Sequence, residues 1–351
     1  AGSATAFGTG AISITSGAAL DLNGQTMTST GTLALNGTGI SSGGALLNSG
    51  GAATYAGLIS LGSDASIMGG SGSITLSNVG TILGAGKALT LGGAAGGSIA
   101  SVIGTGAGTL TKSGSGTWTL SGSNTFTGAT SVSDGTLALS GSGTISTSSG
   151  VTTSGSGVFS ITGASSDITI TSLTGSSTAT TGLVLGARTL TLSNASGTYS
   201  GVIDGTGGLA LTTGTETLSG ANTYTGGTVL NGGTLKAGNA RAFGTGSISV
   251  LAGAALDLNG QTMTSTGGLT LNGTGISSAG SLLNSSGTAA TYAGLVTLGS
   301  ASSIMGGSGS ITLSNSGTIT GSGFGLTLGG TSGGSIASII GTDAGTLTKS
   351  G

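Results

Sequence analysis

The chain has 351 residues, of which 79 are glycine, and it contains no proline, cysteine or histidine. Charged residues make up 4% and the formal net charge is −2, with the six lysines and arginines far apart in the sequence, which excludes the basic patch of a nucleic-acid-binding protein. The missing imidazoles and thiols also exclude the usual bases, nucleophiles and zinc ligands. Hydrophobic residues reach 35% and the mean hydropathy is +0.42, which opposes a disordered Gly/Ser linker.

Short segments of alternating apolar and polar residues run along the chain. They begin at 11–15 and 19–24 and recur at 73–78, 88–93 and 136–141. Each is bounded by Gly, Asn or Ser, and alternation of this length is typical of β-strands joined by tight turns. No segment sustains the period of an amphipathic helix, and none approaches the ~18 apolar residues of a transmembrane helix. The sequence therefore predicts an all-β protein with no transmembrane segment.

A long repeat organises the chain. Residues 6–49 and 242–285 differ at only eight of 44 aligned positions, at an offset of 236. After a one-residue insertion the match continues at an offset of 237, so that Lys112 aligns with Lys349. We interpret 1–236 as a first long copy and 237–351 as a partial second copy of one continuous fold. This interpretation predicts a fragment of a longer tandem array, in which the next residues would read much like "SGTWTLSGSN".

The pattern predicts a right-handed parallel β-helix, or β-solenoid, of roughly 15 coils with about 20–25 residues in each. Leu, Ile, Val and Ala point inward, whereas Ser, Thr and the rare charged residues, such as Asp21 and Asp257, point outward. Glycine and asparagine suit the corners, and the absence of proline suits a chain that is hydrogen-bonded nearly throughout. The alternative is a β-sandwich or several small β-domains, which predicts longer strands, aromatic core anchors and some proline.

The charged residues form no catalytic motif. β-Helical enzymes that act on polysaccharides need clustered carboxylates, and here the eight acidic residues are scattered. The "GGSGSIT" segments at 69–75 and 306–312 lack the aspartate of calcium-binding repeats. We expect no enzymatic activity and no catalytic, cofactor or metal site. A polysaccharide-acting enzyme is a less favoured alternative, as is an ice-binding protein, because the spacing of the Thr-x-Thr pairs is irregular.

Two shorter segments, 108–139 and 207–237, match each other and resemble the autotransporter-associated β-strand repeat, also called the passenger-associated transport repeat. That family shows the pattern L-x-G-x-N-x-Y/F-x-G-x-T followed by G-x-L. The matching residues are Leu120, Gly122, Asn124, Phe126, Gly128, Thr130, Gly135 and Leu137 in the first segment, and Leu218, Gly220, Asn222, Tyr224, Gly226, Thr228, Gly233 and Leu235 in the second. We expect Leu120 and Phe126 to point inward and Gly122, Asn124 and Gly128 to form turns.

The resemblance implies a bacterial passenger domain that is exported across the outer membrane to the cell surface or the medium through a C-terminal β-barrel. It also implies that the repeats help the chain to fold during export. The sequence contains neither that barrel nor a signal peptide, so we expect both to lie outside this fragment, or export to use another route.

We therefore expect a structural or adhesive surface protein that forms a stiff rod or fibre and mediates attachment to cells, as in a biofilm. The alternative is a self-associating filament or sheath subunit. The expected partners are other copies of the chain, through stacked repeats or lateral association, or the surface of a host or neighbouring cell, including its glycans. We expect no nucleic-acid partner.

Trp118 is the only tryptophan, and two interpretations of it stay open: an exposed aromatic contact for a sugar ring, or a structural residue at the rim of a coil. The short repeat aligns Trp118 with Glu216, and the long repeat aligns Lys87 with Phe324. A buried unpaired charge is costly. We therefore expect both positions to lie at strand beginnings, where the side chain turns to solvent.

Overall fold

The computed structural model describes residues 1–28, 31–264 and 267–351. It is an all-β structure in which parallel strands stack as a β-solenoid of about 16 turns, which confirms the predicted β-helix and excludes the sandwich. The chain forms two compact units. Unit 1 contains residues 1–171 and 176–184, and unit 2 contains residues 172–175 and 185–351. The division of the chain into a first long copy at 1–236 and a partial second copy at 237–351 stays a prediction.

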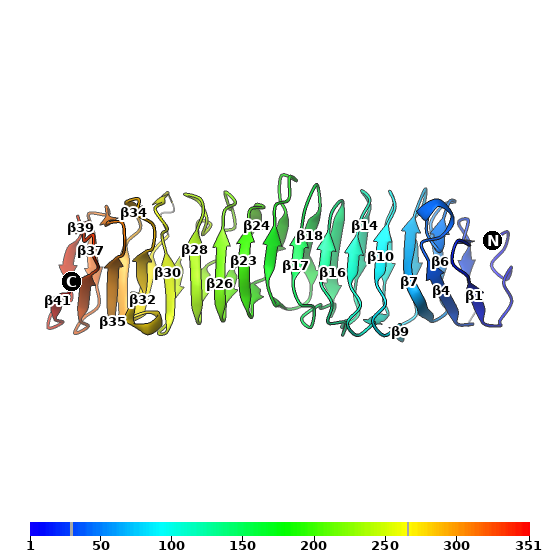
Figure 1. Cartoon of the computed structure of the whole chain (residues 1–351), viewed down its shortest axis with the longest axis horizontal. Coiled ribbons are helices and arrows are strands. Elements are labelled where there is room, and N and C mark those ends of the chain that lie inside the picture. The colour runs from blue at the N-terminus through cyan, green and yellow to red at the C-terminus, as the bar shows by residue number, and fades with distance from the viewer. Residues whose placement is uncertain (29–30, 265–266) are drawn as a thin grey trace. The chain divides into compact units, whose positions relative to one another are not determined.

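In unit 1 the strands form three rows along the coils, and Figure 1 shows β14, β16 and β18 of one row following one another. Strand β7 is long enough to belong to two rows, because its first half pairs with β4 and its second half with β5. The first row holds β1 (Ile12–Ile14), β4 (Leu33–Gly37), β7 (Ile59–Gly69), β9 (Thr81–Leu83), β12 (Val102–Gly104) and β19 (Ile168–Ile170). The second row holds β2 (Leu20–Asp21), β5 (Leu46–Asn48), β10 (Leu89–Gly92), β13 (Leu110–Lys112), β15 (Thr130–Val132) and β17 (Val151–Thr153). The third row holds β3 (Thr26–Met27), β6 (Ala53–Tyr55), β8 (Ile74–Leu76), β11 (Gly97–Ile99), β14 (Thr117–Leu120), β16 (Thr136–Gly141), β18 (Val158–Ala164) and β21 (Leu183–Gly186).

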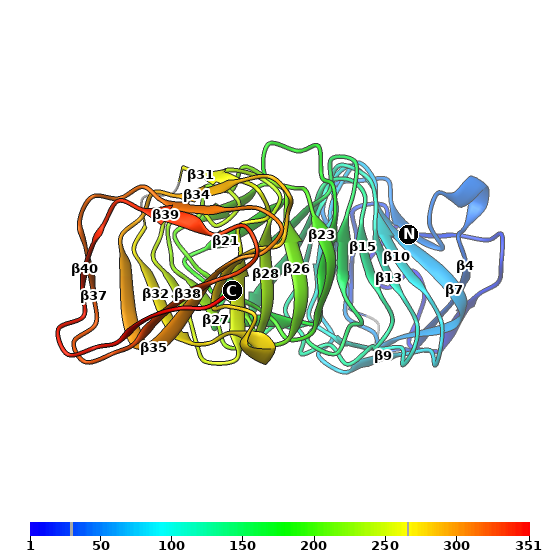
Figure 2. The ribbon, with the colours of Figure 1, turned by 60° about the vertical axis from the view of Figure 1, so that its left-hand side comes forward.

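Unit 2 repeats this arrangement, and Figure 2 shows β31, β34 and β39 following one another along one face. Its first row holds β22 (Leu190–Leu192), β25 (Leu209–Leu211), β27 (Thr228–Leu230), β29 (Ile248–Val250), β32 (Leu269–Gly273), β35 (Val296–Gly306), β37 (Thr318–Thr320) and β40 (Ile339–Gly341). Its second row holds β20 (Leu173–Gly175), β23 (Ala195–Tyr199), β26 (Gly214–Leu218), β28 (Gly233–Ala237), β30 (Ala254–Asp257), β33 (Leu282–Asn284), β38 (Leu326–Gly329) and β41 (Leu347–Lys349), with β35 again shared. Its third row holds β24 (Ile203–Gly205), β31 (Thr262–Met263), β34 (Ala290–Tyr292), β36 (Ile311–Leu313) and β39 (Gly334–Ile336).

The alternating leucine and isoleucine pairs form the interior of each unit. Leu33 and Leu35, and likewise Leu89 and Leu91, are fully buried. Each side chain lies directly above its partner in the next coil, as Leu89 does on Leu110. Stacking of this kind removes apolar surface from water at about 25 cal/mol per Å². The period-2 pattern therefore predicts the core positions correctly.

Coil length varies more than the sequence predicts. Leu209 pairs with Thr228, 19 residues on, whereas Leu269 pairs with Val296, 27 residues on. The long coil contains the single-turn 3₁₀ helix η2 (Ile276–Ser278), and its counterpart in unit 1 contains η1 (Ile40–Ser42). These excursions lengthen the coil, and the strand register shifts in the same coils, between Leu271 and Gly273 in unit 2 and between Leu35 and Gly37 in unit 1. Neither helical turn has the length needed to cross a bilayer, and the described residues contain no helix that does.

The two aspartates that were expected to point outward differ in how exposed they are. Asp21 is partly exposed, as predicted, whereas Asp257 is only 2% exposed. The reason is a cover of neighbouring side chains, because the Ser285 hydroxyl donates to Asp257 Oδ2 at 2.5 Å and Lys236 Nζ lies 3.7 Å from the same oxygen. An outward-facing position can thus be buried by the long side chain of the adjacent coil.

Candidate functional site

The two short repeats have the most constrained local geometry. In the first, Asn124 is 2% exposed, and its side chain connects three coils. Its Oδ1 accepts a hydrogen bond from the backbone N–H of Ile103 at 2.8 Å, and its Nδ2 donates to the carbonyls of Gly122 at 2.9 Å and Thr144 at 3.0 Å. Ile103 lies in the preceding coil and Thr144 in the following one. Asn124 is therefore buried, and its amide joins three successive coils through hydrogen bonds, an arrangement that we call an amide clamp.

Asn222 repeats this clamp in the second segment. It is 1% exposed, its Oδ1 accepts from the N–H of Ile203 at 2.9 Å, and its Nδ2 donates to the carbonyl of Ala242 at 2.6 Å. An apolar residue of similar size could not satisfy these buried backbone groups, each of which costs roughly 1–3 kcal/mol when left unpaired. The chemistry of the position explains why asparagine occupies it in both segments.

The glycines of the motif mark places where successive coils touch through backbone. A Cβ on Gly122 would collide with the carbonyl oxygen of Ser101, and one on Gly220 would collide with that of Gly201. Gly128 and Gly226 make similarly close approaches to the preceding coil, at Gly108 and Gly207. These glycines are required by close approach, since they set the distance between coils at the corner.

The aromatic residues of the motif are buried, as predicted for Phe126. Tyr224 is its counterpart, and the Tyr224 hydroxyl lies 2.6 Å from Thr228 Oγ1. In the first segment the matching threonine, Thr130, instead pairs with Ser148 Oγ at 3.0 Å. Burial raises the pKa of Tyr224, so its hydroxyl stays protonated. Leu120 and Leu218 are fully buried, which confirms the inward direction predicted for Leu120.

The prediction that Trp118 turns to solvent is wrong. Its side chain is fully buried on β14, and its indole Nε1–H donates to the carbonyl of Gly92 at 2.9 Å. It stands beside Gly97 of the preceding coil, where a Cβ would lie 2.9 Å from the ring atoms Cζ3 and Cη2. The missing side chain of Gly97 makes room for the ring. Trp118 therefore has no exposed ring face on which a sugar could stack.

Glu216, expected at the same rim, is also fully buried. Neither carboxyl oxygen has a hydrogen-bond partner among the described residues, and burial raises the pKa of Glu216 to about 8. The carboxyl therefore carries a proton at neutral pH. The expectation failed because it assumed a charged group, whereas a buried carboxyl can escape the cost of desolvation by taking up a proton.

Lys112 is a second exception to the expectation that charges point outward. It is fully buried, and its Nζ donates to the carbonyls of Ser113 at 3.0 Å, Gly114 at 2.6 Å and Asp134 at 2.9 Å. Desolvation lowers the pKa of Lys112 to about 8, against the opposing charge of Asp134. Alternation with the inward-facing Leu110 was the signal that could have placed this ammonium inside a coil.

The Lys87 and Phe324 pair behaves as predicted. Phe324 is 37% exposed and Lys87 is partly exposed, so this position does lie at a rim. Within residues 1–28, 31–264 and 267–351, no three Asp or Glu side chains gather into a group that could hold a metal ion.

Comparison with known families adds one finding. The sequence model of the passenger-associated transport repeat matches residues 110–139 and 213–237. Both segments are passenger-associated transport repeats. We call them the first and second transport repeats. No curated protein and no solved structure match the chain. The transport repeats and the solenoid fold together support an autotransporter passenger-type β-helical protein.

Proposed function

We propose that this chain is part of an exported passenger domain that serves a structural or adhesive role at the bacterial cell surface or in the surrounding medium. The observation that carries the proposal is that both transport repeats are built into consecutive coils of a parallel β-solenoid. Their clamps and glycine contacts join each coil to its neighbours, which suits a chain that crosses a membrane unfolded and then adds coil upon coil.

The composition supports the same role. The surface is rich in Ser and Thr and carries few charges, so long-range electrostatic steering of a partner is weak. Attachment would instead depend on short-range contacts made by extended, repeated faces. The proposed partners are a host or neighbouring cell surface, glycans included, or other copies of the chain.

Export is tested by placing the 351-residue chain between a signal peptide and a translocator barrel. We expect the chain to become accessible to protease added outside the cell. An Asn124→Ala, Asn222→Ala double variant should reach the surface in a more protease-sensitive form. The matched control is Asn231→Ala, because Asn231 is exposed. Retention of the unaltered chain inside the cell would contradict the proposal.

A filament or sheath subunit is the second candidate. The observation in its favour is apolar surface within unit 1, where Val79 is 80% exposed and Leu83 57% exposed, because such side chains could be covered by a second copy. Electron microscopy of the purified chain separates the two roles. An adhesive segment gives single particles that bind cells when fluorescently labelled, whereas a filament subunit gives ordered fibres. Single particles that bind no cell surface would contradict both roles.

A further inference from the structure

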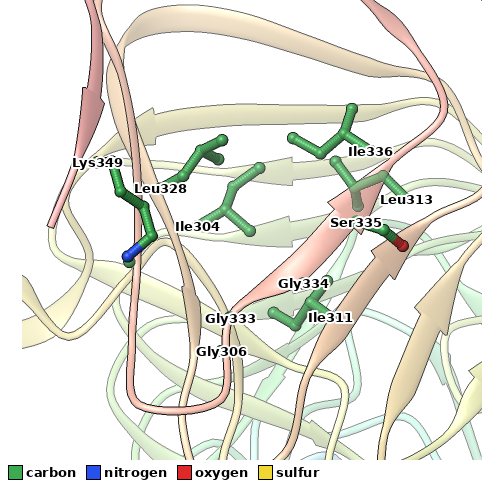
Figure 3. A pocket seen from close by; sticks show the side chains of 11 residues that line it. Ile304, Gly306, Ile311, Leu313, Leu328, Gly333, Gly334, Ser335, Ile336 and Lys349 are labelled. Atoms are coloured by element: carbon green, nitrogen blue, oxygen red, sulfur yellow. The ribbon is translucent and has the colours of Figure 1, made fainter. Parts of the chain in front are cut away.

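The chemistry still unassigned in this chain lies at its Asn-Gly pairs rather than in a cavity. Unit 2 contains an apolar hollow of about 120 Å³, which Figure 3 shows between side chains that include Ile304, Leu328 and Ile336. Among the described residues that line it, only Ser335 and Lys349 have polar side chains. One hydroxyl and one amine, with no acid or amide beside them, offer no catalytic arrangement.

The tripeptide Leu-Asn-Gly occurs five times in the chain. Its asparagines are Asn23, Asn36, Asn231, Asn259 and Asn272. An asparagine that precedes glycine can lose its side-chain amide without an enzyme, because glycine has no side chain to hinder attack of its backbone nitrogen on the asparagine Cγ. The five sites share both neighbouring residues, so a difference in reactivity between them has to come from the fold.

In four of the five pairs, a hydrogen bond to the next coil holds the glycine nitrogen that would have to attack. The donor and acceptor pairs are Gly24 N–H with Asn48 Oδ1 at 2.8 Å, Gly260 N–H with Asn284 Oδ1 at 2.8 Å, Gly37 N–H with Ser63 Oγ at 2.9 Å, and Gly273 N–H with Ser300 Oγ at 2.9 Å. Attack by any of these nitrogens would cost a hydrogen bond between coils.

The side-chain amides of the same four asparagines are held by the preceding coil. Each Nδ2 donates to a backbone carbonyl, from Asn23 to Ala1 at 3.2 Å, from Asn36 to Ile14 at 2.8 Å, from Asn259 to Ala237 at 2.8 Å, and from Asn272 to Val250 at 2.9 Å. This nitrogen is the group that has to leave in the reaction, so the fold engages both reacting groups of these four pairs.

Asn231 differs from the other four asparagines in both respects. Its side chain is exposed, and neither its amide nor the N–H of Gly232 has a hydrogen-bond partner among the described residues. The pair forms the turn between β27 and β28, and the backbone N–H of Asn231 donates to the carbonyl of Leu211 at 2.8 Å. The turn is thus anchored to the preceding coil, while both of its reacting groups are free.

We propose that Asn231 is a site of spontaneous modification, at which the folded chain converts this asparagine to aspartate or isoaspartate. The backbone nitrogen of Gly232 loses its proton and attacks Asn231 Cγ, a C–N bond forms, and the side-chain nitrogen leaves as ammonia. Water then opens the resulting succinimide ring. Cleavage of the bond from the Gly232 nitrogen to Cγ gives aspartate, whereas cleavage of its bond to the main-chain carbonyl carbon gives isoaspartate.

The modification changes the second transport repeat at this turn. It adds one carboxylate, so the formal net charge goes from −2 to −3. Isoaspartate also lengthens the main chain of the turn by one carbon atom. The space for this is small, because a Cβ on Gly232 would lie 2.5 Å from the carbonyl oxygen of Thr212 in the preceding coil. The isoaspartate form therefore displaces the turn from that coil.

The experiment incubates the purified full chain in mildly alkaline buffer and maps its tryptic peptides by mass spectrometry over time. Trypsin cleaves after Arg188 and Lys236, so Asn231 lies in the peptide 189–236, apart from the other four pairs. We expect conversion at Asn231 to be at least about tenfold faster than at any of the four, since each of those has two hydrogen bonds to break. The matched control is the same chain in denaturant, where the five rates should be similar.

Conversion at Asn231 that is no faster than at the other four sites of the folded chain overturns the proposal. So does a lead of Asn231 that persists in denaturant, because the following Gly233 and not the fold would then explain it. Asn231→Gln should abolish conversion in the peptide 189–236. Conversion that continues there would assign the reaction to Asn194 or Asn222 and would also overturn the proposal.

Discussion

The first and second transport repeats place different chemistry at one interior position. Trp118 fills its space with a ring and satisfies its N–H on Gly92, whereas Glu216 has two carboxyl oxygens with no hydrogen-bond partner in the described structure. Both side chains are fully buried, and both precede a buried leucine by two residues. This interior position therefore accepts either an aromatic ring or a protonated carboxyl group, while other contacts of the repeat fix the coil around it.

The two repeats share the asparagine and glycine contacts that hold successive coils together, and we call these contacts the frame. Asn124 and Asn222 each bond the N–H of an isoleucine in the preceding coil and a carbonyl in the following coil. Gly122 and Gly220 each allow the preceding backbone to come close. The comparison teaches that the motif encodes coil stacking through its amides and glycines, while the side chain that fills the interior can vary.

The largest expected effect is the pH dependence introduced by Glu216. Its pKa is about 8 in the folded chain, against an ordinary value of 4.5 for an exposed glutamate. Between these values the folded state holds a proton that the unfolded state has lost. Stability should therefore fall as pH rises from 4.5 to 8, by at most about 1.4 kcal/mol per pH unit, and by on the order of 5 kcal/mol in all.

Glu216→Gln is the matched control, because it keeps the shape and cannot ionise. Denaturant unfolding of both proteins at pH 5 and pH 8.5 measures the difference. The loss of stability with rising pH should disappear in the glutamine variant. An equal loss in both proteins would show that Glu216 does not titrate as described.

Replacing the other interior side chain tests the opposite half of the comparison. Trp118→Ala should destabilise unit 1 by about 3–5 kcal/mol, since it leaves a cavity above Gly97 and an unpaired carbonyl on Gly92. The control is Val79→Ala, because Val79 is 80% exposed, and it should change stability by less than about 0.5 kcal/mol. Denaturant midpoints measure both, and a small effect of Trp118→Ala would place the ring outside the core.

The shared frame predicts equal effects in both repeats. Asn124→Ala and Asn222→Ala should each cost about 2–4 kcal/mol, because each leaves buried backbone groups unpaired. Hydrogen exchange should show loss of protection at Ile103 in the first variant and at Ile203 in the second. A large difference between the two variants would break the claim that the repeats share one frame.

Of the two titrating groups in the interior, Lys112 gives the smaller effect on stability, with the opposite sign. Its pKa is about 8 in the folded chain, against an ordinary value of 10.5 for an exposed lysine. In that range the unfolded state binds more protons than the folded state, so stability should rise with pH by about 3 kcal/mol in all. Lys112→Met should remove this rise between pH 8 and pH 10.5, as followed by thermal unfolding. A persistent rise would assign the titration to another group.

The period-2 pattern was enough to predict the coils and the buried leucine pairs, because strand parity alone determines which side chains face inward. Parity also placed Trp118, Glu216 and Lys112 inside, and the sequence interpretation overruled it by treating acid and amine as fixed charges. Trp118 and Lys112 find carbonyl partners at Gly92 and Asp134, about one coil away, and the protonation of Glu216 follows from its burial, none of which strand parity shows. The role of asparagine as a clamp between coils could not be predicted for the same reason, since its hydrogen-bond partners lie about one coil away in the sequence.

Intrinsic fluorescence tests most directly the claim that this position of the transport repeats lies inside the solenoid. Because Trp118 is the only tryptophan, the emission of the native chain reports on that one side chain. Burial predicts a blue-shifted emission that acrylamide and iodide quench poorly, and a red shift with efficient quenching after unfolding. Native emission close to that of tryptophan in water, quenched freely by iodide, would contradict the account.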